Sequence, residues 1–265
     1  MGASVDSLGC VERLARIDTS TYAGNLALIS AVRTSLQANG IAFSDCFDPQ
    51  GSRGIIAGTI PDARGRTRGG IAFIGQYGVN TGVLPARACA ETIPRLRNGF
   101  LYGRGPIGIK AFLGLILGLL PVMKSTKLSW PIHLVVHFEH SVRSDSISHS
   151  FASFMEHHAS LISICGACTG LKMIPRSSHC VEEGVELSEF VHAALQRHPI
   201  HSGSEATANA PCIAFWGPGG PAVAEDADDC VELTQLAQCS AQLKGLISSM
   251  TSTIDNQGAP DVPIT

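Results

Sequence analysis

Three ionisable residues lie close together at the end of one predicted strand. The apolar segment 131–138 is rich in β-branched and aromatic residues and is predicted to be a strand, and His137, Glu139 and His140 lie at its carboxyl end. Open α/β sheets bind their ligands at the carboxyl ends of strands. Because imidazole and carboxylate groups transfer protons near neutral pH, we expect acid–base chemistry here. A polar strand end without a catalytic role is the alternative.

The same residues allow a second kind of site. His137 and Glu139 are two positions apart and share one face of a strand, so they form, with His140 and Glu225, an alternative set of metal ligands. Nothing in the spacing requires a metal, and acid–base chemistry is the favoured interpretation.

A CxxC pair, Cys165 and Cys168, follows another predicted strand. A redox pair or a nucleophile is one interpretation. A zinc site would need a second such pair, and a redox CxxC usually opens a helix rather than leaving a strand. The chain has nine cysteines scattered along its length, which favours buried structural thiols.

The elements that position these residues alternate between helices and strands. Apolar residues at helical spacing predict helices over 4–16, 25–39, 109–123, 148–158 and 231–250. Apolar runs between turn residues predict strands over 41–47, 54–60, 69–75, 131–138 and 161–165. This alternation is typical of a three-layer α/β/α sandwich, and we expect a mixed, mostly parallel sheet.

Composition excludes several classes of function. Hydrophobic residues make up 45% of the 265 residues and charged residues 15%, as in a well-buried globular protein. The formal net charge of −3 provides no basic surface, so we expect no nucleic-acid partner. Residues 1–10 lack the features of a secretory signal, and we expect a cytoplasmic protein with reduced thiols. The apolar run 111–123 is shorter than the roughly 20 residues that cross a bilayer, so we expect a buried helix and no membrane contact.

Several short segments share a pattern with one enzyme family. The segment 101–110 resembles the LYGRG-x-x-D-x-K segment of the zinc amidohydrolase and exopeptidase family that includes acetylornithine deacetylase, desuccinylases and aminoacylases. The resemblance extends over roughly residues 10–250, in segments 17–20, 75–79, 138–142, 166–174, 203–206 and 215–219. It implies the catalytic-domain fold of that family.

The resemblance also implies where the family binds two metal ions, and these positions have changed. The metal-binding His, the bridging Asp, the second Glu, the acid and the last His of the family correspond to Gln76, Gly108, Ser141, Ala167 and Glu225. Glycine and alanine have no side-chain ligand, and zinc needs three or four N, O or S donors. We therefore expect no family-type metal site and no cofactor.

The resemblance further implies a set of working groups at the crevice. The family's general base corresponds to His140, although a one-residue slip of the alignment would place Glu139 there, and Glu205 matches a family Glu near the metals. Arg104 either binds the ligand or pairs with a neighbouring acid. We expect catalytic roles for Glu139, His140, Glu205 and Glu225, and substrate binding by Gln76, His137 and Arg104.

The chain is short for this family. The family's second, lid-like domain, which mediates dimers, is reduced here to a truncated insertion around 174–202. We expect a single domain over 1–250 and a flexible tail over 251–265. The oligomeric state stays open because the dimer domain is largely absent.

These features predict a metal-independent, repurposed relative of acetylornithine deacetylase-type amidohydrolases. It would act by acid–base catalysis on a small amino-acid-derived or acylated substrate in a biosynthetic pathway. Whether it is an enzyme stays open. A non-catalytic pseudoenzyme that binds a ligand or a partner protein is the first alternative, and an amide hydrolase with substitute metal ligands is the second.

Overall fold

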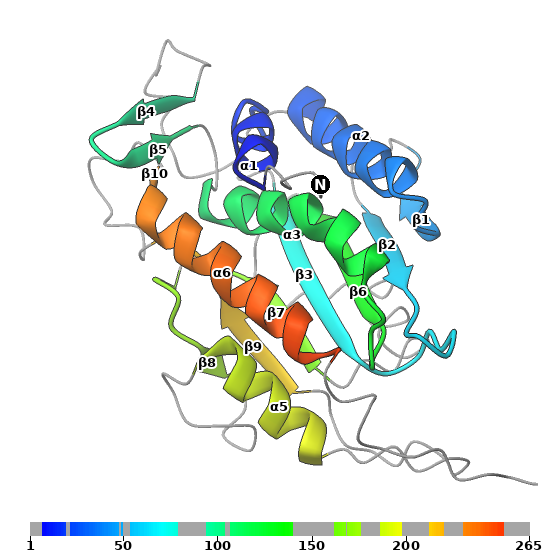
Figure 1. Cartoon of the computed structure of the whole chain (residues 1–265). Coiled ribbons are helices and arrows are strands. Elements are labelled where there is room, and N and C mark those ends of the chain that lie inside the picture. Colours follow the sequence, from blue (N-terminus) through cyan, green and yellow to red (C-terminus); the bar gives the residue numbers. More distant parts are fainter. Residues whose placement is uncertain are drawn as a thin grey trace, which may run out of the picture.

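The fold is given by a computed structural model of the chain (Figure 1). It describes residues 7–19, 22–47, 49, 54–78, 94–103, 107–139, 162–167, 169–175, 186–197, 212–219 and 230–251. The described helices are α1 (Ser7–Ala15), α2 (Tyr22–Ala38), α3 (Ile107–Ser125), α5 (Leu187–Arg197) and α6 (Leu233–Ser249). The strands are β1 (Phe43–Phe47), β2 (Gly54–Ile60), β3 (Ile71–Gly78), β4 (Arg95–Arg97), β5 (Phe100–Tyr102), β6 (Ile132–Glu139), β7 (Ile162–Gly166), β8 (Ile174–Pro175), β9 (Cys212–Trp216) and β10 (Cys230–Glu232). The predicted helix over 148–158 lies outside the described residues.

Seven strands form one sheet, in the order β1-β2-β6-β3-β7-β9-β8. Its central strands β6, β3, β7 and β9 are parallel, whereas β1 pairs antiparallel with β2, β2 with β6, and β8 with β9. Three short strands form a second sheet, in the order β10-β5-β4. The expected α/β class with a mixed, mostly parallel sheet is therefore confirmed.

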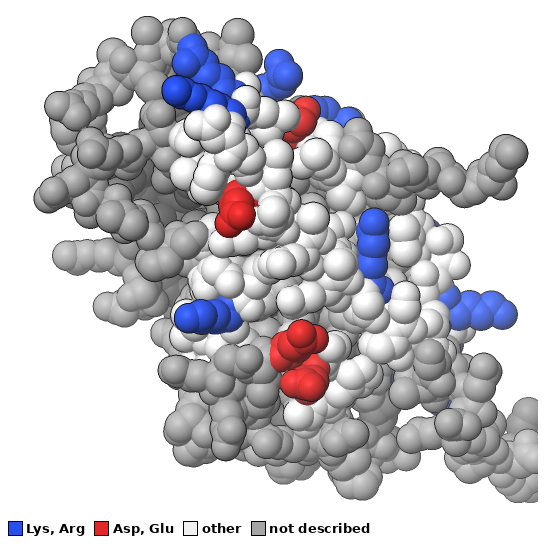
Figure 2. Space-filling view, turned by 60° about the vertical axis from the view of Figure 1, so that its left-hand side comes forward, with Lys and Arg blue, Asp and Glu red and all other residues white. Residues whose placement is uncertain are grey.

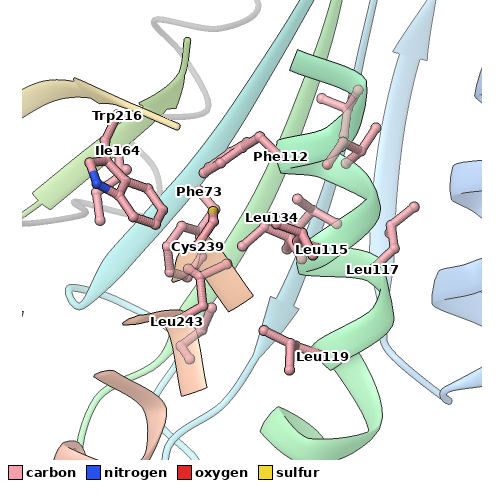
Figure 3. Close-up of a cluster of buried hydrophobic side chains, with 14 of the residues drawn as sticks. Phe73, Phe112, Leu115, Leu117, Leu119, Leu134, Ile164, Trp216, Cys239 and Leu243 are labelled. Atoms are coloured by element: carbon pink, nitrogen blue, oxygen red, sulfur yellow. The ribbon is translucent and has the colours of Figure 1, made fainter. Parts of the chain in front are cut away.

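Each face of the large sheet carries its own group of buried apolar side chains. All the described helices contribute to the first group, in which Phe73 and Trp216 of the sheet both pack against Phe112 of α3, with ring centroids 6.3 Å apart in each pair (Figure 3). The second face of the sheet carries a smaller buried group: Ile55, Ala57, Ala72, Ile74 and Val135. Since both of their faces are buried, β3 and β6 have nearly continuous apolar sequences.

The core helix α3 is longer than the sequence predicted. It spans 19 residues, Ile107–Ser125, against the predicted 109–123. By length and composition α3 could cross a membrane, so the expectation that this run is too short was wrong. The expectation of a buried helix is confirmed, because 78% of its most apolar 18-residue stretch is buried inside the protein. Gly118 allows close packing with α1, since a Cβ there would lie 2.6 Å from Cα of Ser7. Burial against α1 and the sheet accounts for the apolar sequence of α3.

Strand β3 also extends beyond its predicted end. The sequence predicts a strand over 69–75, whereas β3 spans Ile71–Gly78. Its parallel partner β6 continues to Glu139, and the two strands pair along their whole length, with Gly78 opposite Glu139. Pairing with β6 keeps the glycine-containing end of β3 extended, a tertiary effect that local propensity does not show.

A buried lysine connects two of the segments on which the family resemblance rests. Lys110, near the start of α3, is fully buried, and its Nζ donates a hydrogen bond to the carbonyl of Ile17, 2.6 Å away. Ile17 lies in the turn that follows α1. A buried ammonium group requires acceptors, so Lys110 holds this turn against the start of α3.

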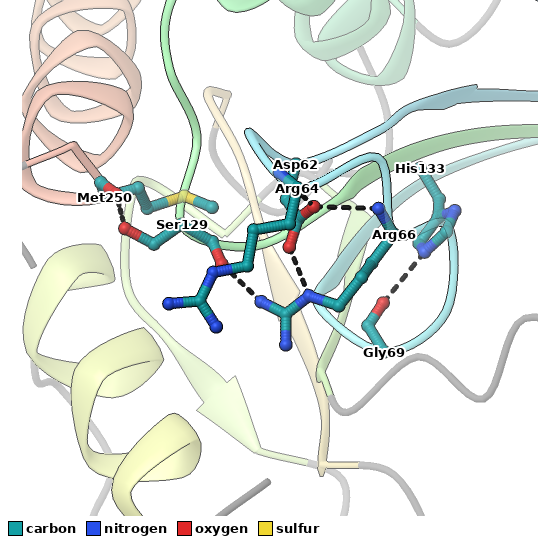
Figure 4. A network of polar contacts seen from close by, with 7 residues as sticks. All are labelled: Asp62, Arg64, Arg66, Gly69, Ser129, His133 and Met250. Carbon is teal, nitrogen blue, oxygen red and sulfur yellow. Dashed lines mark hydrogen bonds and ion pairs between the residues drawn. The ribbon is translucent and has the colours of Figure 1, made fainter. Parts of the chain in front are cut away.

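A polar network lies where the central strands β3 and β6 begin (Figure 4). We call this end of the sheet the amino edge, and the end where these strands finish the carboxyl edge. One carboxylate oxygen of Asp62 accepts hydrogen bonds from the N–H groups of Arg64 (2.9 Å) and Arg66 (2.8 Å), and the other pairs with the Arg66 guanidinium. That guanidinium also donates to the carbonyl of Ser129 (3.0 Å). Ser129 in turn donates from its N–H and its hydroxyl to the carbonyl of Met250. The network joins the β2–β3 turn, the segment before β6 and the end of α6.

His133 of β6 lies at the same amino edge and is fully buried. Its Nε2 lies 2.8 Å from the carbonyl oxygen of Gly69, and its Nδ1 lies 3.0 Å from the hydroxyl of Thr59. Because a carbonyl can only accept, Nε2 carries the proton and Nδ1 accepts the hydrogen bond of Thr59. Both ring nitrogens are therefore satisfied.

The small sheet lies at one side of the molecule, beside the start of α6 (Figure 1). Figure 2 brings this side forward and shows several basic side chains gathered at its upper left, with further basic and a few acidic side chains scattered over the rest of the face. Within the small sheet, Leu101 and Val231 pair and are both buried, so β5 and β10 are anchored to the core. Strand β5 is followed by Gly103, and α3 begins at Ile107.

Candidate functional site

The carboxyl ends of the central strands meet at one edge of the sheet, where a ligand crevice is expected. At this edge Gln76 of β3 lies directly opposite His137 of β6, and Gly78 lies opposite Glu139. Neighbouring strands are about 4.8 Å apart, so one small ligand could reach all these positions. The structure describes the backbone, but not the side chains, of Gln76 and Glu139.

Among the predicted site residues, His137 is the one whose side chain the structure describes. It is 5% exposed. Side chains alternate along a strand, so His137 shares a face of β6 with Val135 and His133, and its partner position on β2 is Ile55. A nearly buried imidazole at the carboxyl end of a strand is placed to hold or transfer a proton with little competition from solvent.

The other predicted residues lie outside the described part of the chain. They are Arg104, His140, Glu205 and Glu225, together with Ser141 and Cys168. Their roles stay predictions. Cys165 lies in β7, half-buried, on the same face of the sheet as Ile74, its partner position on β3.

Tyr77 is a residue of this edge that sequence reasoning missed. It alternates with Gln76 and Gly78, and so lies on the first face, 1% exposed. Its hydroxyl donates to the carbonyl of Ile109 in the first turn of α3, 2.9 Å away. Burial raises the pKa of Tyr77 well above its usual value, so the hydroxyl stays a hydrogen-bond donor at neutral pH. The sequence feature that accompanies Tyr77 is Gly75, two residues earlier on the same face. A Cβ at Gly75 would lie 3.1 Å from the tyrosine ring.

The ends of β7 and β9 are joined by backbone contacts. The N–H of Ala167 donates to the carbonyl of Trp216 (3.2 Å), and the N–H of Gly170 donates to the carbonyl of Gly219 (2.7 Å). The N–H of Gly219 is held by the side chain of Gln235 in α6, 2.7 Å away. The segments 166–174 and 215–219, both similar to the family, thus fold against each other and close this side of the edge.

The described residues do not fit the binuclear metal site of the family. Two of its ligand positions fall in the described structure without a side-chain donor: Gly108 in the first turn of α3, and Ala167, which follows β7. The described part of the chain also contains no group of three or more His, Cys, Asp or Glu side chains that could hold a metal ion. We derive no chemistry through a metal at this edge.

Comparison with solved structures places the fold. A glutaminyl cyclase from Fimbriiglobus ruber matches with a TM-score of 0.52 and 10% identity, over 93% of this chain and 95% of that one. A leucine aminopeptidase precursor from Bacteroides thetaiotaomicron matches with a TM-score of 0.52 and 9% identity, over 92% and 96%. The M20 family metallo-carboxypeptidase Sso-CP2 from Sulfolobus solfataricus matches with a TM-score of 0.50 and 14% identity, over 64% and 40%.

This chain spans 40% of the length of the carboxypeptidase. Two dipeptidases also match 64% of this chain, which again spans 40% of their length. No family model and no curated protein matches the sequence. Identities this low bear on the fold alone. The chain therefore has the zinc-exopeptidase-like α/β fold that its sequence resemblance implied.

Proposed function

We propose that this protein is a metal-independent relative of the acetylornithine deacetylase-type amidohydrolases. In this proposal it binds a small amino-acid-derived or acylated molecule at the carboxyl edge of the sheet and acts on it by acid–base catalysis. The setting is a cytoplasmic, biosynthetic one, without a nucleic-acid or membrane partner.

One observation carries the proposal: the register of β3 and β6. It puts Gln76 beside His137, and Gly78 beside Glu139, at the edge where this class of fold binds ligands. Proton-transferring and hydrogen-bonding residue types are thus retained at the edge, whereas Gly108 and Ala167 supply no metal donor. Loss of metal donors with retention of acids and imidazoles is expected of a site whose chemistry no longer uses a metal.

The proposed chemistry is a proton transfer at the bound substrate. Glu139 or His140 would accept a proton, and Glu205 or Glu225 would return one; a positioned acid or base contributes typically about 10² to 10⁴ in rate. Gln76 and His137 would hold polar groups of the ligand by hydrogen bonds. Arg104 would pair with a ligand carboxylate or with one of these acids.

The test is turnover of a defined panel by the purified full chain. N-acetyl amino acids, N-succinyl amino acids and dipeptides are incubated with the protein, with and without a chelator, and products are followed by mass spectrometry. We expect turnover that the chelator leaves unchanged and that Glu139→Gln, His140→Ala and Glu205→Gln each abolish. Activity that survives all three substitutions would show that these residues do not carry it.

Two outcomes support the alternative functions instead. Binding of a panel member without any product would indicate a pseudoenzyme. A content near one zinc per chain after equilibration, with a loss of thermal stability on chelation, would return the function to a metal-dependent amide hydrolase. The ligands would then include His137, Glu139, His140 or Glu225.

A further inference from the structure

Three aromatic rings form a continuous row across the carboxyl edge of the sheet. Phe47 of β1, Gly54 of β2, Phe138 of β6 and Tyr77 of β3 occupy one line of paired positions. The ring centroids of Phe47 and Phe138 are 5.9 Å apart, as are those of Phe138 and Tyr77. We call Phe47, Phe138 and Tyr77 the aromatic row.

A glycine makes this row possible. Strand β2 lies between β1 and β6, and its residue in this line is Gly54. A Cβ on Gly54 would lie 2.1 Å from the carbonyl oxygen of Cys46 and 2.8 Å from Cδ1 of Phe47, so a side chain here would clash with both the backbone of β1 and the ring. The row therefore spans four strands with three rings.

Each end of the row is attached to a helix. At one end the Arg33 guanidinium of α2 lies 5.1 Å from the ring centroid of Phe47 and pairs with Asp45 at 2.6 Å. At the other end Tyr77 donates its hydroxyl hydrogen to the carbonyl of Ile109 in α3. The row thus links two helices to the strand ends at the candidate site.

The row is interleaved with the site positions. Tyr77 lies between Gln76 and Gly78, and Phe138 lies between His137 and Glu139. Because side chains alternate along a strand, the rings face the first core while His137 faces the other side of the sheet. The contacts that hold these rings in place therefore also hold the backbone that carries the site residues.

We infer that Tyr77 is a positioning residue for the candidate site: through its hydroxyl it holds the carboxyl ends of β3 and β6 in a fixed relation to the first turn of α3. This inference rests on the proposed function, since it assigns Tyr77 to the same site. Burial keeps the hydroxyl protonated, so the contact persists across the pH range in which histidines titrate.

The test is Tyr77→Phe in the full chain, which removes the hydroxyl and keeps the ring. Two histidines of β6 serve as reporters by NMR: His137 at the carboxyl end and His133, four residues earlier, at the amino end. We expect the ring signals of His137 to change and those of His133 to stay unchanged. We also expect amide exchange at Gly78 and Glu139 to rise roughly fivefold, as for the loss of one hydrogen bond, with no rise at Ile132.

Matched variants separate positioning from general loosening of the fold. Thr59→Val removes the hydroxyl partner of His133 and should alter His133 alone, the reverse of Tyr77→Phe. Phe138→Leu, which removes the middle ring of the row, should again alter His137 alone. If Tyr77→Phe leaves both histidines unchanged, or changes both equally, the inference is overturned.

These readouts need no ligand, so a negative result would overturn the role of Tyr77 without bearing on the proposed function. Turnover or binding of the N-acyl amino acid panel by the unaltered chain tests the function. The two histidine signals test Tyr77.

Discussion

The two ends of strand β6 differ in how their polar groups are used. At the amino end His133 has a partner for each ring nitrogen, and nearby Asp62 and Arg66 tie three segments of the chain together. At the carboxyl end the described frame is held by an aromatic row and one tyrosine hydroxyl, on the face opposite to His137.

The difference separates stability from function within one sheet. At the amino edge Asp62 and His133 are buried and hydrogen-bonded, so they stabilise the fold. At the carboxyl edge Tyr77 and Phe138 on the first face supply rigidity, and His137 of the proposed site lies on the other face. Substitutions at the two edges should therefore affect different properties, from unfolding free energy at one to turnover at the other.

The largest expected effect comes from breaking the amino-edge network with Asp62→Ala. The Asp62 side chain is only 1% exposed, and its loss leaves two backbone N–H groups without their acceptor and removes the carboxylate partner of the Arg66 guanidinium. We expect a loss of about 3 kcal/mol in unfolding free energy, measured by urea denaturation. The control is Asp45→Ala in the exposed Arg33 pair, which should cost less than about 1 kcal/mol. Equal costs for the two variants would remove the basis for calling the amino edge the stabilising one.

A smaller loss is expected when one hydrogen bond of His133 is removed. Thr59→Val keeps the shape of the side chain but leaves Nδ1 of a fully buried imidazole without its donor. Such an unsatisfied buried group costs roughly 1 to 2 kcal/mol, again measured by urea denaturation. Panel turnover should stay at the level of the unaltered chain, because His133 lies at the opposite end of β6 from the proposed site. A large drop in turnover with little loss of stability would contradict the division between the two edges.

The pH dependence of the unfolding free energy at alkaline pH tests the buried core that lies between the two edges. Burial raises the pKa of Cys239 in α6 above its ordinary value of 9.0. A thiol is neutral when protonated, so this contribution to stability is complete below pH 9 and is lost as the pH rises and the unfolded chain ionises. Above pH 9 the unfolding free energy should fall by about 1.4 kcal/mol per pH unit from this group alone, followed by urea midpoints between pH 8 and 10.5. Cys239→Ala should flatten the slope; an unchanged slope would assign it to other groups.

Tyr77 adds a further loss of unfolding free energy at higher pH. Its pKa is raised above 10.0 by burial, so its contribution begins to disappear only above pH 10. Tyr77→Phe should remove this second part and leave the part that begins near pH 9. The two variants together separate the helix side of the core from the carboxyl edge.

Much of the fold was predictable because long elements carry strong local signals. The predicted strand over 54–60 has the bounds of β2, and the predicted helix over 231–250 contains α6, because each has an uninterrupted apolar pattern. Strands β4 and β5 pair locally across Asn98-Gly99, both with positive φ, a hairpin signal that sequence reasoning missed. Strand β10 pairs with β5 across a long stretch of sequence, as Val231 does with Leu101, so no local pattern marks it. The end of β3 was misplaced for the same reason, since it is β6 that keeps Gln76 and Gly78 extended.

The sequence predicted the location of the candidate site but not the contacts that hold it. It placed Gln76, His137 and Glu139 at the ends of two predicted strands, where the carboxyl-edge rule expects a ligand. That these two strands are neighbours comes from the structure. The role of Tyr77 depends on how the first turn of α3 docks on β3, a contact between residues 32 positions apart that spacing does not reveal.

The smallest expected effect on stability is at the carboxyl edge, from Glu139→Gln. The substitution keeps the size of the side chain at the last residue of β6 and removes its charge. We expect the unfolding free energy, measured by urea denaturation, to change by less than about 0.5 kcal/mol, while turnover of the N-acyl amino acid panel is lost because an amide cannot accept the proton. Gln76→Ala, at the neighbouring strand end, should weaken ligand binding and leave some turnover, since an amide that only holds the ligand is not required for the proton transfer. A Glu139→Gln protein that loses several kcal/mol, or that keeps full turnover, would show that the carboxyl edge is a second structural edge rather than the working one.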